Sequence, residues 1–172
     1  GKGYEFVSQT DTEVIAHLVH YYYKGDLLGA VENVLRRIRG AFALAISCKD
    51  EPGRIVAARV AAPLVIALGE NENFVASDPM ALAGVTDRYI YLEDGDVADV
   101  RQQSAEIYNL QGDQFVRVER PVSVVQGFSQ NIALGPYTHY MQKEIFEQPQ
   151  AISDTLEGVV GISSSIFGHE TP

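Results

Sequence analysis

This sequence has a single cysteine, Cys48, among its 172 residues. One cysteine excludes an internal disulfide and is typical of a reducing compartment, so we expect a cytoplasmic protein. No stretch approaches the roughly 18 apolar residues of a membrane-spanning helix and no secretory leader is recognisable, so we expect no membrane partner. The chain begins with Gly1 rather than Met, which favours a trimmed or partial sequence.

Positive charge is also scarce. The chain has 13 Lys and Arg residues against 23 Asp and Glu residues, a formal net charge of -10, and a pI near 4.7. This balance repels the phosphate backbone of nucleic acids, so we expect no nucleic-acid partner. The longest basic run, Arg36, Arg37 and Arg39, closes a helical pattern, where cations complement the helix dipole.

Two helices are predicted near the start of the chain. Thr10 and Glu13 have the spacing of a capping box, and apolar residues then recur at helical spacing to residue 24. Asp26 is a candidate N-cap for a second apolar stripe over residues 27–38. The turn between them is short, so the helices are expected to pack as a hairpin.

From residue 41 the pattern changes to short runs rich in Val, Ile, Phe and Tyr, separated by turns such as Glu51-Pro52-Gly53. The predicted strands are residues 41–47, 54–59, 64–68, 74–77, 88–92, 96–100, 105–108 and 115–120. They leave no room for repeated parallel crossovers, so the sheets are expected to be mainly antiparallel. A helical hairpin followed by many strands predicts an α+β layered domain.

The last third of the chain is less regular. Residues 121–136 have no steady period and are interpreted as a connection. Residues 137–156 are again helical, with a bend or break expected at Pro149. Residues 158–172 are rich in Gly and Ser, which is typical of a linker.

Few side chains are candidates for chemistry. Cys48 follows an apolar run, where a cysteine is usually a small packing residue rather than a nucleophile. His17 and His20 share one helix face, but no third metal ligand is suggested and Lys24 would repel a cation, so a solvated polar face is the favoured interpretation. No metal site and no cofactor are expected.

Two further groups have simpler explanations than catalysis. Glu93, Asp94 and Asp96 could bind a cation, but in a strand–turn–strand setting such residues more often make the turn. Residues 161–165 resemble a nucleophile elbow only superficially, because Ser165 stands where the elbow has Gly. A linker is the favoured interpretation of that segment.

Asp11 is the strongest candidate for ligand binding. It stands in the first turn of the first predicted helix, where the helix dipole favours an ionised carboxylate. Such a carboxylate can bind the ammonium group of a ligand. From the residues alone, stabilisation of the helix start is the more common role.

Six segments resemble, in order, the glucosamine-6-phosphate synthases, a family of glutamine-dependent aminotransferases. They are residues 3–18, 39–44, 63–66, 76–78, 92–97 and 139–149. The segment H-Y-M-Q-K-E-I-F-E-Q-P at 139–149 is the most specific, whereas T-D-T-E-V at 10–14 also resembles other class II amidotransferases. One departure is Ala61-Ala62, where the family usually has Gly-Ser.

The resemblance implies an N-terminal-nucleophile hydrolase-like fold. Two antiparallel sheets lie between helical layers in an α/β/β/α arrangement, here expected to be incomplete at its N-terminus. Residues 1–120 correspond to the C-terminal part of a type-2 glutamine amidotransferase domain. Residues 121–172 correspond to an interdomain connection and a helical arm that leads into a sugar isomerase domain.

The resemblance also implies an activity. In the family an N-terminal cysteine hydrolyses glutamine, and the ammonia converts fructose-6-phosphate to glucosamine-6-phosphate in an enzyme expected to be a homo-oligomer. Of the family's site residues only Asp11 has a counterpart here, as the carboxylate that binds the α-ammonium of glutamine. We therefore expect the chain alone to be inactive. Two alternatives stay open, namely another class II amidotransferase such as the purine-pathway enzyme, and a non-catalytic binding module.

Overall fold

The computed structural model describes residues 3–125 and 134–156, which belong to two compact units divided between Asn131 and Ile132. The first unit begins with two helices, α1 (Asp11–Tyr22) and α2 (Leu27–Leu35). Both lie within the predicted ranges. Asp26 is the N-cap of α2, as predicted, because its carboxylate accepts hydrogen bonds from the backbone N–H groups of Leu28 (3.2 Å) and Gly29 (3.1 Å).

The rest of the first unit consists of two sheets in which every pairing is antiparallel. The five-stranded sheet has the order β1 (Phe42–Cys48), β2 (Glu51–Val60), β6 (Asp96–Arg101), β7 (Ala105–Gln111), β8 (Gln114–Val118). The four-stranded sheet has the order β4 (Asn73–Ala76), β3 (Val65–Leu68), β5 (Arg88–Tyr91), β9 (Val122–Val124). The predicted antiparallel α+β architecture is confirmed.

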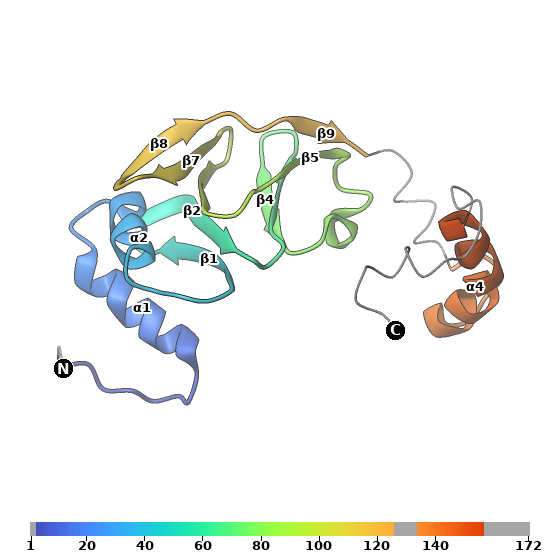
Figure 1. The fold of residues 1–172 in the computed structure, drawn as a ribbon, viewed down its shortest axis with the longest axis horizontal. Coiled ribbons are helices and arrows are strands. Elements are labelled where there is room, and N and C mark those ends of the chain that lie inside the picture. Colours follow the sequence, from blue (N-terminus) through green and yellow to red (C-terminus); the bar gives the residue numbers. More distant parts are fainter. Residues whose placement is uncertain (1–2, 126–133, 157–172) are drawn as a thin grey trace, which may run out of the picture. The chain divides into compact units, whose positions relative to one another are not determined.

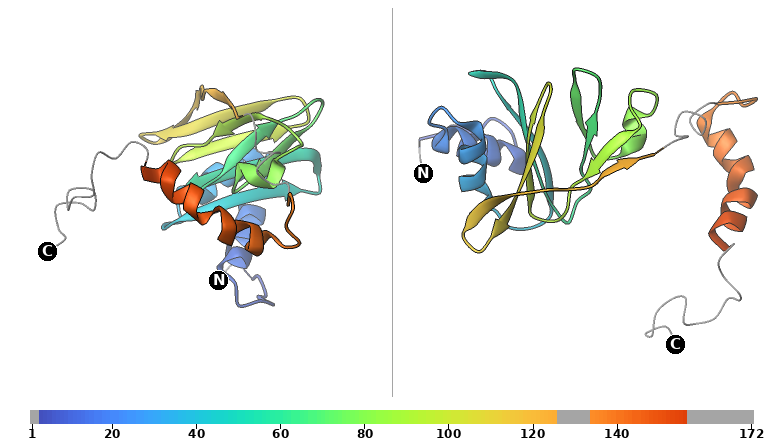
Figure 2. Two further views of the ribbon diagram at one scale, coloured as in Figure 1. Left: turned by 90° about the vertical axis from the view of Figure 1, so that its right-hand side faces the viewer. Right: turned by 90° about the horizontal axis from the view of Figure 1, so that it is seen from above.

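These elements form stacked layers. Figure 1 shows α1 and α2 beside β1 and β2, and the right-hand view of Figure 2 shows the helices, the five-stranded sheet and the four-stranded sheet in that order. Alternation along β2 explains the stacking, since Val56 and Ala58 pack against the helices while Ala57 packs between the sheets. The outer face of the second sheet, around Tyr89, packs against the 3-10 helix η1 (Pro79–Leu82).

The connection between β1 and β2 differs from the prediction. The turn lies at residues 49–50, while Pro52 and Gly53 are part of β2. The register shifts there, because Ser47 pairs with Ile55 whereas Cys48 pairs with Glu51. Gly53 has φ +75°, which suits a bulge because glycine has no Cβ to clash. A turn signal in the sequence therefore marks an irregularity inside a strand.

The predicted connection at residues 121–136 also contains structure. Strand β9 pairs with β5 in the register Ile90 to Val122, so the chain crosses from the first sheet to the edge of the second. Three residues are too few to show a strand period, which is why the sequence pattern misses β9. The predicted domain limits, 1–120 and 121–172, stay a prediction.

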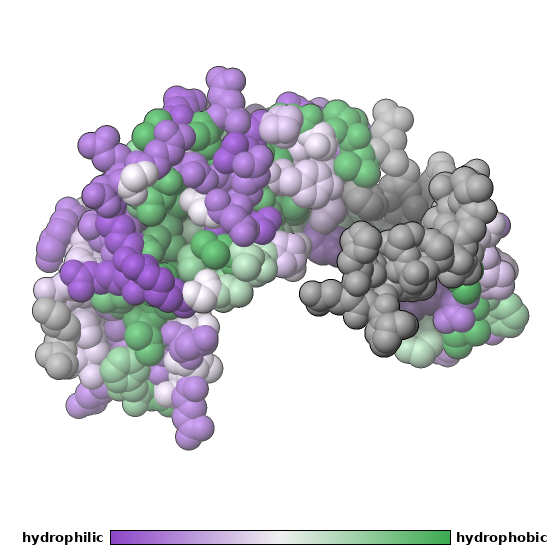
Figure 3. Space-filling view, in the orientation of Figure 1, coloured by the Kyte–Doolittle hydropathy of each residue, from purple (hydrophilic) through white to green (hydrophobic). Residues whose placement is uncertain are grey.

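In the second unit one helix is described, α4 (Tyr140–Leu156). It contains Pro149 without being split there, so a break at this residue is wrong, while a bend stays a prediction because proline removes one hydrogen bond from the helix. Several of its large apolar side chains are exposed, including Met141 and Phe146, and Figure 3 shows hydrophobic residues on this helix. No described helix has the length and apolar character to cross a membrane. The tail at 158–172 and the elbow-like segment within it lie outside the described residues.

Candidate functional site

Asp11 is the first residue of α1, in the first turn as predicted, and its side chain is exposed. Among the described residues, its carboxylate has one hydrogen-bonding neighbour, the Thr12 hydroxyl at 3.5 Å, which is at the outer limit of such a contact. Most of the acceptor capacity of Asp11 is therefore available to a ligand.

Glu13 is arranged differently from the predicted capping box. Thr10 is the N-cap residue of α1, but its side chain makes no capping hydrogen bond. The Glu13 carboxylate reaches past Thr10 to the preceding segment, where it accepts hydrogen bonds from the backbone N–H groups of Val7 (2.8 Å) and Ser8 (2.7 Å). The capping-box prediction is thus wrong in its partners, because Glu13 accepts from N–H groups two and three residues before the N-cap rather than from that of Thr10.

The Ser8 hydroxyl connects this carboxylate to the helix start. It donates a hydrogen bond to Glu13 and accepts one from the backbone N–H of Thr10 at 3.3 Å. The Ser8 and Thr10 hydroxyl oxygens are also within hydrogen-bonding distance, at 2.9 Å. These bonds hold the pKa of Glu13 at about 2, with the Ser8 hydroxyl as the largest cause and the Val7 N–H as the next.

The two histidines of α1 contact the same segment from the other side. The Tyr4 ring stacks on His17 at a centroid distance of 4.6 Å, and the Phe6 ring meets His17 edge-on at 4.9 Å. The Tyr4 hydroxyl and His20 Nδ1 lie 2.7 Å apart. The sequence predicts that this face of α1 is solvated. In the structure the aromatic side chains of Tyr4 and Phe6 cover His17.

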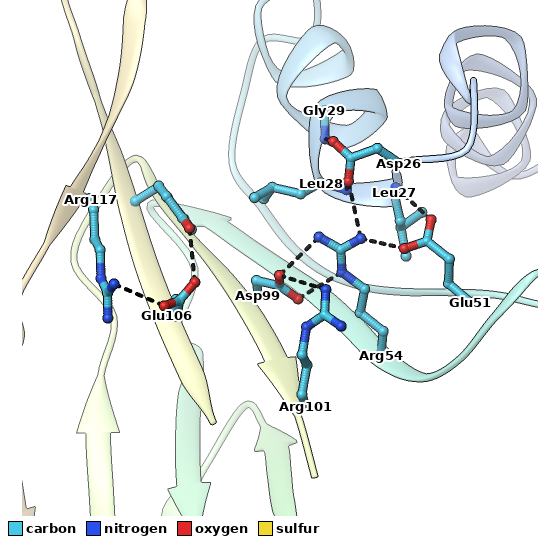
Figure 4. Close-up of polar contacts among 11 residues, drawn as sticks. Asp26, Leu27, Leu28, Gly29, Glu51, Arg54, Asp99, Arg101, Glu106 and Arg117 are labelled. Carbon is cyan, nitrogen blue, oxygen red and sulfur yellow. Dashed lines mark hydrogen bonds and ion pairs between the residues drawn. The ribbon is translucent and has the colours of Figure 1, made fainter. Parts of the chain in front are cut away.

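A second polar cluster joins α2 to the five-stranded sheet (Figure 4). Arg54 on β2 is only 8% exposed and donates two hydrogen bonds to Asp99 on β6, at 2.8 and 2.9 Å. It also pairs with Glu51 and with Asp26, which lies 3.1 Å away. Glu51 in turn accepts a hydrogen bond from the Leu27 N–H at 2.7 Å. The hydrogen bonds to Asp99 are the largest cause of the raised pKa of Arg54, so the cation is permanent.

The acidic turn after β5 is occupied by ion pairs. Asp94 pairs with Arg59 and accepts a hydrogen bond from the Ala61 N–H at 3.0 Å. Asp96 is fully buried and receives two hydrogen bonds from Arg120, both 2.9 Å. The turn interpretation of these carboxylates fits the structure, because arginines fill the positions that a cation would need. Across the described ranges, no group of three or more His, Cys, Asp and Glu residues is placed to hold a metal ion.

Cys48, at the end of β1, is a free and half-buried thiol. It lies on the wall of a hollow of about 520 Å³ between α1 and β1, which His20 and Tyr23 also line. Burial raises the pKa of Tyr23, and Cys48 and Glu51 add to that rise. A phenol that stays neutral and a thiol beside it suit packing rather than nucleophilic attack.

The sequence predicts Asp11 as a ligand-binding residue, which stays a prediction, and gives no sign of the hydrogen bonds that Ser8 and Glu13 make beside it. Asp11 lies in the same helix turn as Glu13, whose carboxylate is bonded to Ser8, whereas Arg54 and Asp99 join α2 to the sheet. Ser8 carried no signal, since a serine two residues before an N-cap is common in loops.

Comparisons with known proteins agree with this fold. Residues 1–84 match the glutamine amidotransferase domain family. Over 168 residues, 98% of this chain, the sequence is 55% identical to the glutamine--fructose-6-phosphate aminotransferase (isomerizing) of Bordetella pertussis, of which it covers 27%. The corresponding enzyme of Xylella fastidiosa is 45% identical over 171 residues, which are 96% of this chain and 28% of that one.

A solved structure provides the same architecture. The glutamine phosphoribosylpyrophosphate amidotransferase from B. subtilis, in complex with ADP and GMP, superposes with a TM-score of 0.54 at 26% identity, over 62% of this chain and 24% of that one. The chain spans about a quarter of the length of the curated relatives it matches. It has the class II glutamine amidotransferase fold and corresponds to the amidotransferase region of the glutamine--fructose-6-phosphate aminotransferases.

Proposed function

We propose that this chain forms part of the glutamine-hydrolysing domain of an enzyme that makes glucosamine-6-phosphate from fructose-6-phosphate and glutamine. The observation that carries the proposal is 55% identity over 98% of the chain to an aminotransferase of that name. Glutamine and fructose-6-phosphate are then the substrates. The working form is a cytoplasmic homo-oligomer of the complete enzyme.

Within this domain Asp11 binds the α-ammonium group of glutamine. Three features support this role: the carboxylate is exposed, it lies at a helix start, and its one hydrogen-bonding neighbour in the described part of the chain is 3.5 Å away. The other carboxylate of the same helix turn, Glu13, has its acceptor positions filled by Val7 and Ser8. Of the two acidic side chains, Asp11 is the one with capacity for an ammonium group.

The chain on its own does not hydrolyse glutamine in this proposal. The only cysteine is Cys48, which stands at the end of a strand beside Tyr23, whereas the family nucleophile is an N-terminal cysteine. Hydrolysis therefore needs groups from outside these 172 residues. Glutaminase activity in the purified chain would contradict this part.

The experiment uses a chimera of the Bordetella pertussis enzyme in which this chain replaces the matching 168-residue segment. We expect glucosamine-6-phosphate synthesis from the chimera. In the Asp11→Asn chimera, we expect KM for glutamine to rise about tenfold or more, because hydrogen bonds to charged groups contribute about 1.5–3 kcal/mol. KM for fructose-6-phosphate should not change. An unaltered KM for glutamine would overturn the role of Asp11, and a folded but inactive chimera would overturn the family function.

A second candidate is another class II amidotransferase, favoured by the structural match to the phosphoribosylpyrophosphate enzyme. The segment at 139–149 argues against it, since it lies within the region that matches the aminotransferases. The third reading, a non-catalytic module, predicts that the chimera folds without restoring synthesis. A chimera that hydrolyses glutamine and makes glucosamine-6-phosphate supports the aminotransferase. A chimera that hydrolyses glutamine without making glucosamine-6-phosphate supports another class II amidotransferase.

A further inference from the structure

We propose that Glu13 is the positioning residue for Asp11: its carboxylate ties residues 7–10 to the first turn of α1 and so fixes the direction of the ligand-binding carboxylate. This inference rests on the proposed role of Asp11. Glu13 itself touches no substrate. The two neighbouring carboxylates have different roles. Glu13 binds the protein's own N–H groups, and Asp11 is left to bind the ligand.

The need for such a residue follows from the helix start. Asp11 is the first residue of α1, and the N-cap side chain of Thr10 makes no capping hydrogen bond. The first turn of a helix without a side-chain cap has unsatisfied N–H groups and tends to fray. A carboxylate on that turn can hold a ligand in one geometry only if the turn itself is held.

Glu13 supplies the missing restraint. Its two oxygens receive the backbone N–H groups of Val7 (2.8 Å) and Ser8 (2.7 Å), and one of them also receives the Ser8 hydroxyl. All three bonds are charge-assisted, which makes them stronger than bonds between neutral groups. His17 Nε2, one turn further along α1, lies 3.4 Å from Oε1 of the same carboxylate.

The restraint is passed on to the residue next to Asp11. The Ser8 hydroxyl, held by Glu13, accepts the Thr10 N–H at 3.3 Å and meets the Thr10 hydroxyl at 2.9 Å. Thr10 is thereby bonded to the clamp, and Asp11 follows it directly in the chain. The rings of Tyr4 and Phe6 on His17 hold the same segment from its other end.

The first readout of this clamp is hydrogen exchange. In the Glu13→Ala chain the amides of Val7 and Ser8 should exchange at least tenfold faster than in the unchanged chain. Glu13→Gln, which keeps one acceptor oxygen, should give an intermediate rate. Glu5→Gln is the matched control, because Glu5 is exposed and makes no hydrogen bond or ion pair within the described residues. Unchanged exchange in Glu13→Ala would overturn the clamp.

The second readout is a double-mutant cycle in the chimera. Glu13→Ala should raise KM for glutamine about fivefold with little change in kcat, since it weakens binding of substrate and transition state alike. In the Asp11→Asn background the same change should have almost no further effect. Additive effects, or faster exchange without a change in KM, would overturn positioning. If Asp11→Asn alone leaves KM unchanged, the proposed role of Asp11 fails, and the positioning role fails with it.

Discussion

Arg120 donates hydrogen bonds from Nε and Nη2 to the two carboxylate oxygens of Asp96, each at 2.9 Å, and Asp96 is completely buried. The same carboxylate receives the Glu93 N–H (2.7 Å) and the Asn109 amide (2.8 Å). Burial alone would raise the pKa of Asp96, but the hydrogen bonds from Arg120 lower it below its usual range. The chain at the end of β8 is thus tied to the start of β6.

Removal of Arg120 should be strongly destabilising. Arg120→Ala leaves the Asp96 charge buried and unpaired, so we expect a loss of about 3–5 kcal/mol in the free energy of unfolding. Arg117→Ala is the control, because Arg117 is 66% exposed in its pair with Glu106 and should contribute less than about 1 kcal/mol. Urea unfolding of both variants, best done in the chimera, measures the difference. Equal losses would contradict the buried-pair explanation.

Asp26 has two roles, as the N-cap of α2 and as an ion-pair partner of Arg54. Asp26→Ala removes the acceptor for the Leu28 and Gly29 N–H groups and should cost about 1–2 kcal/mol. Asp26→Asn keeps one of the two acceptor oxygens of the cap and loses the ion pair with Arg54, in which Asp26 is 62% exposed, so it should cost less than Asp26→Ala. Thermal unfolding of the two variants decides whether the cap or the ion pair matters more.

Ala61 stands in a conformation that glycine adopts more easily. Its φ is +54°, a region that costs an alanine about 1 kcal/mol, and it occupies the position where the resembling family usually has glycine. Ala61→Gly should therefore stabilise the chain by about 0.5 kcal/mol after the greater entropy of unfolded glycine is included. Ala62→Gly, whose φ is not positive, should destabilise it. Chemical unfolding that ranks these two variants in the opposite order would contradict the strain.

Acid titration tests the clamp at Glu13 independently of activity. Because its folded pKa of about 2 lies below the ordinary value of 4.5, the clamp stabilises the chain above about pH 4.5 and its contribution is lost as the pH falls toward 2. A carboxyl carbon titration by NMR should place the Glu13 midpoint near pH 2 while circular dichroism shows a folded chain. Ser8→Ala should raise that midpoint, since the Ser8 hydroxyl is the largest cause of the low pKa. An unchanged midpoint would remove Ser8 from the clamp.

Strand β1 should make the isolated chain prone to association. It is an edge of the five-stranded sheet, contains no charge and no proline, and exposes Ala43, Ala45 and Ser47 on one face. An uncharged edge strand is a template for pairing with another chain. Light scattering of the 172-residue chain should therefore rise with concentration, and Ala45→Lys should reduce it. A monomer at all concentrations, with a sharp unfolding transition, would contradict this expectation.

Much of the fold could be predicted because it depends on local patterns. The apolar stripes of α1 and α2 and the Asp26 cap arise from residues within a few positions of one another. The errors arise where a contact or a segment does not follow a standard motif or is too short to show a period. Glu13 contacts residues five and six positions earlier, β9 is three residues long, and Pro52-Gly53 lies inside β2 beside a shift in register rather than in a turn.

For the candidate site, the sequence by itself determined that Asp11 begins a helix and that few other side chains offer chemistry. Only the tertiary structure decided which carboxylate is free. Asp11 and Glu13 are two positions apart and chemically similar, yet one is exposed and the other is filled by Val7 and Ser8. The buried pairs Arg54–Asp99 and Asp96–Arg120 join residues 45 and 24 positions apart. Such pairs depend on how the sheets stack, because no local pattern records which distant charge a strand will bury.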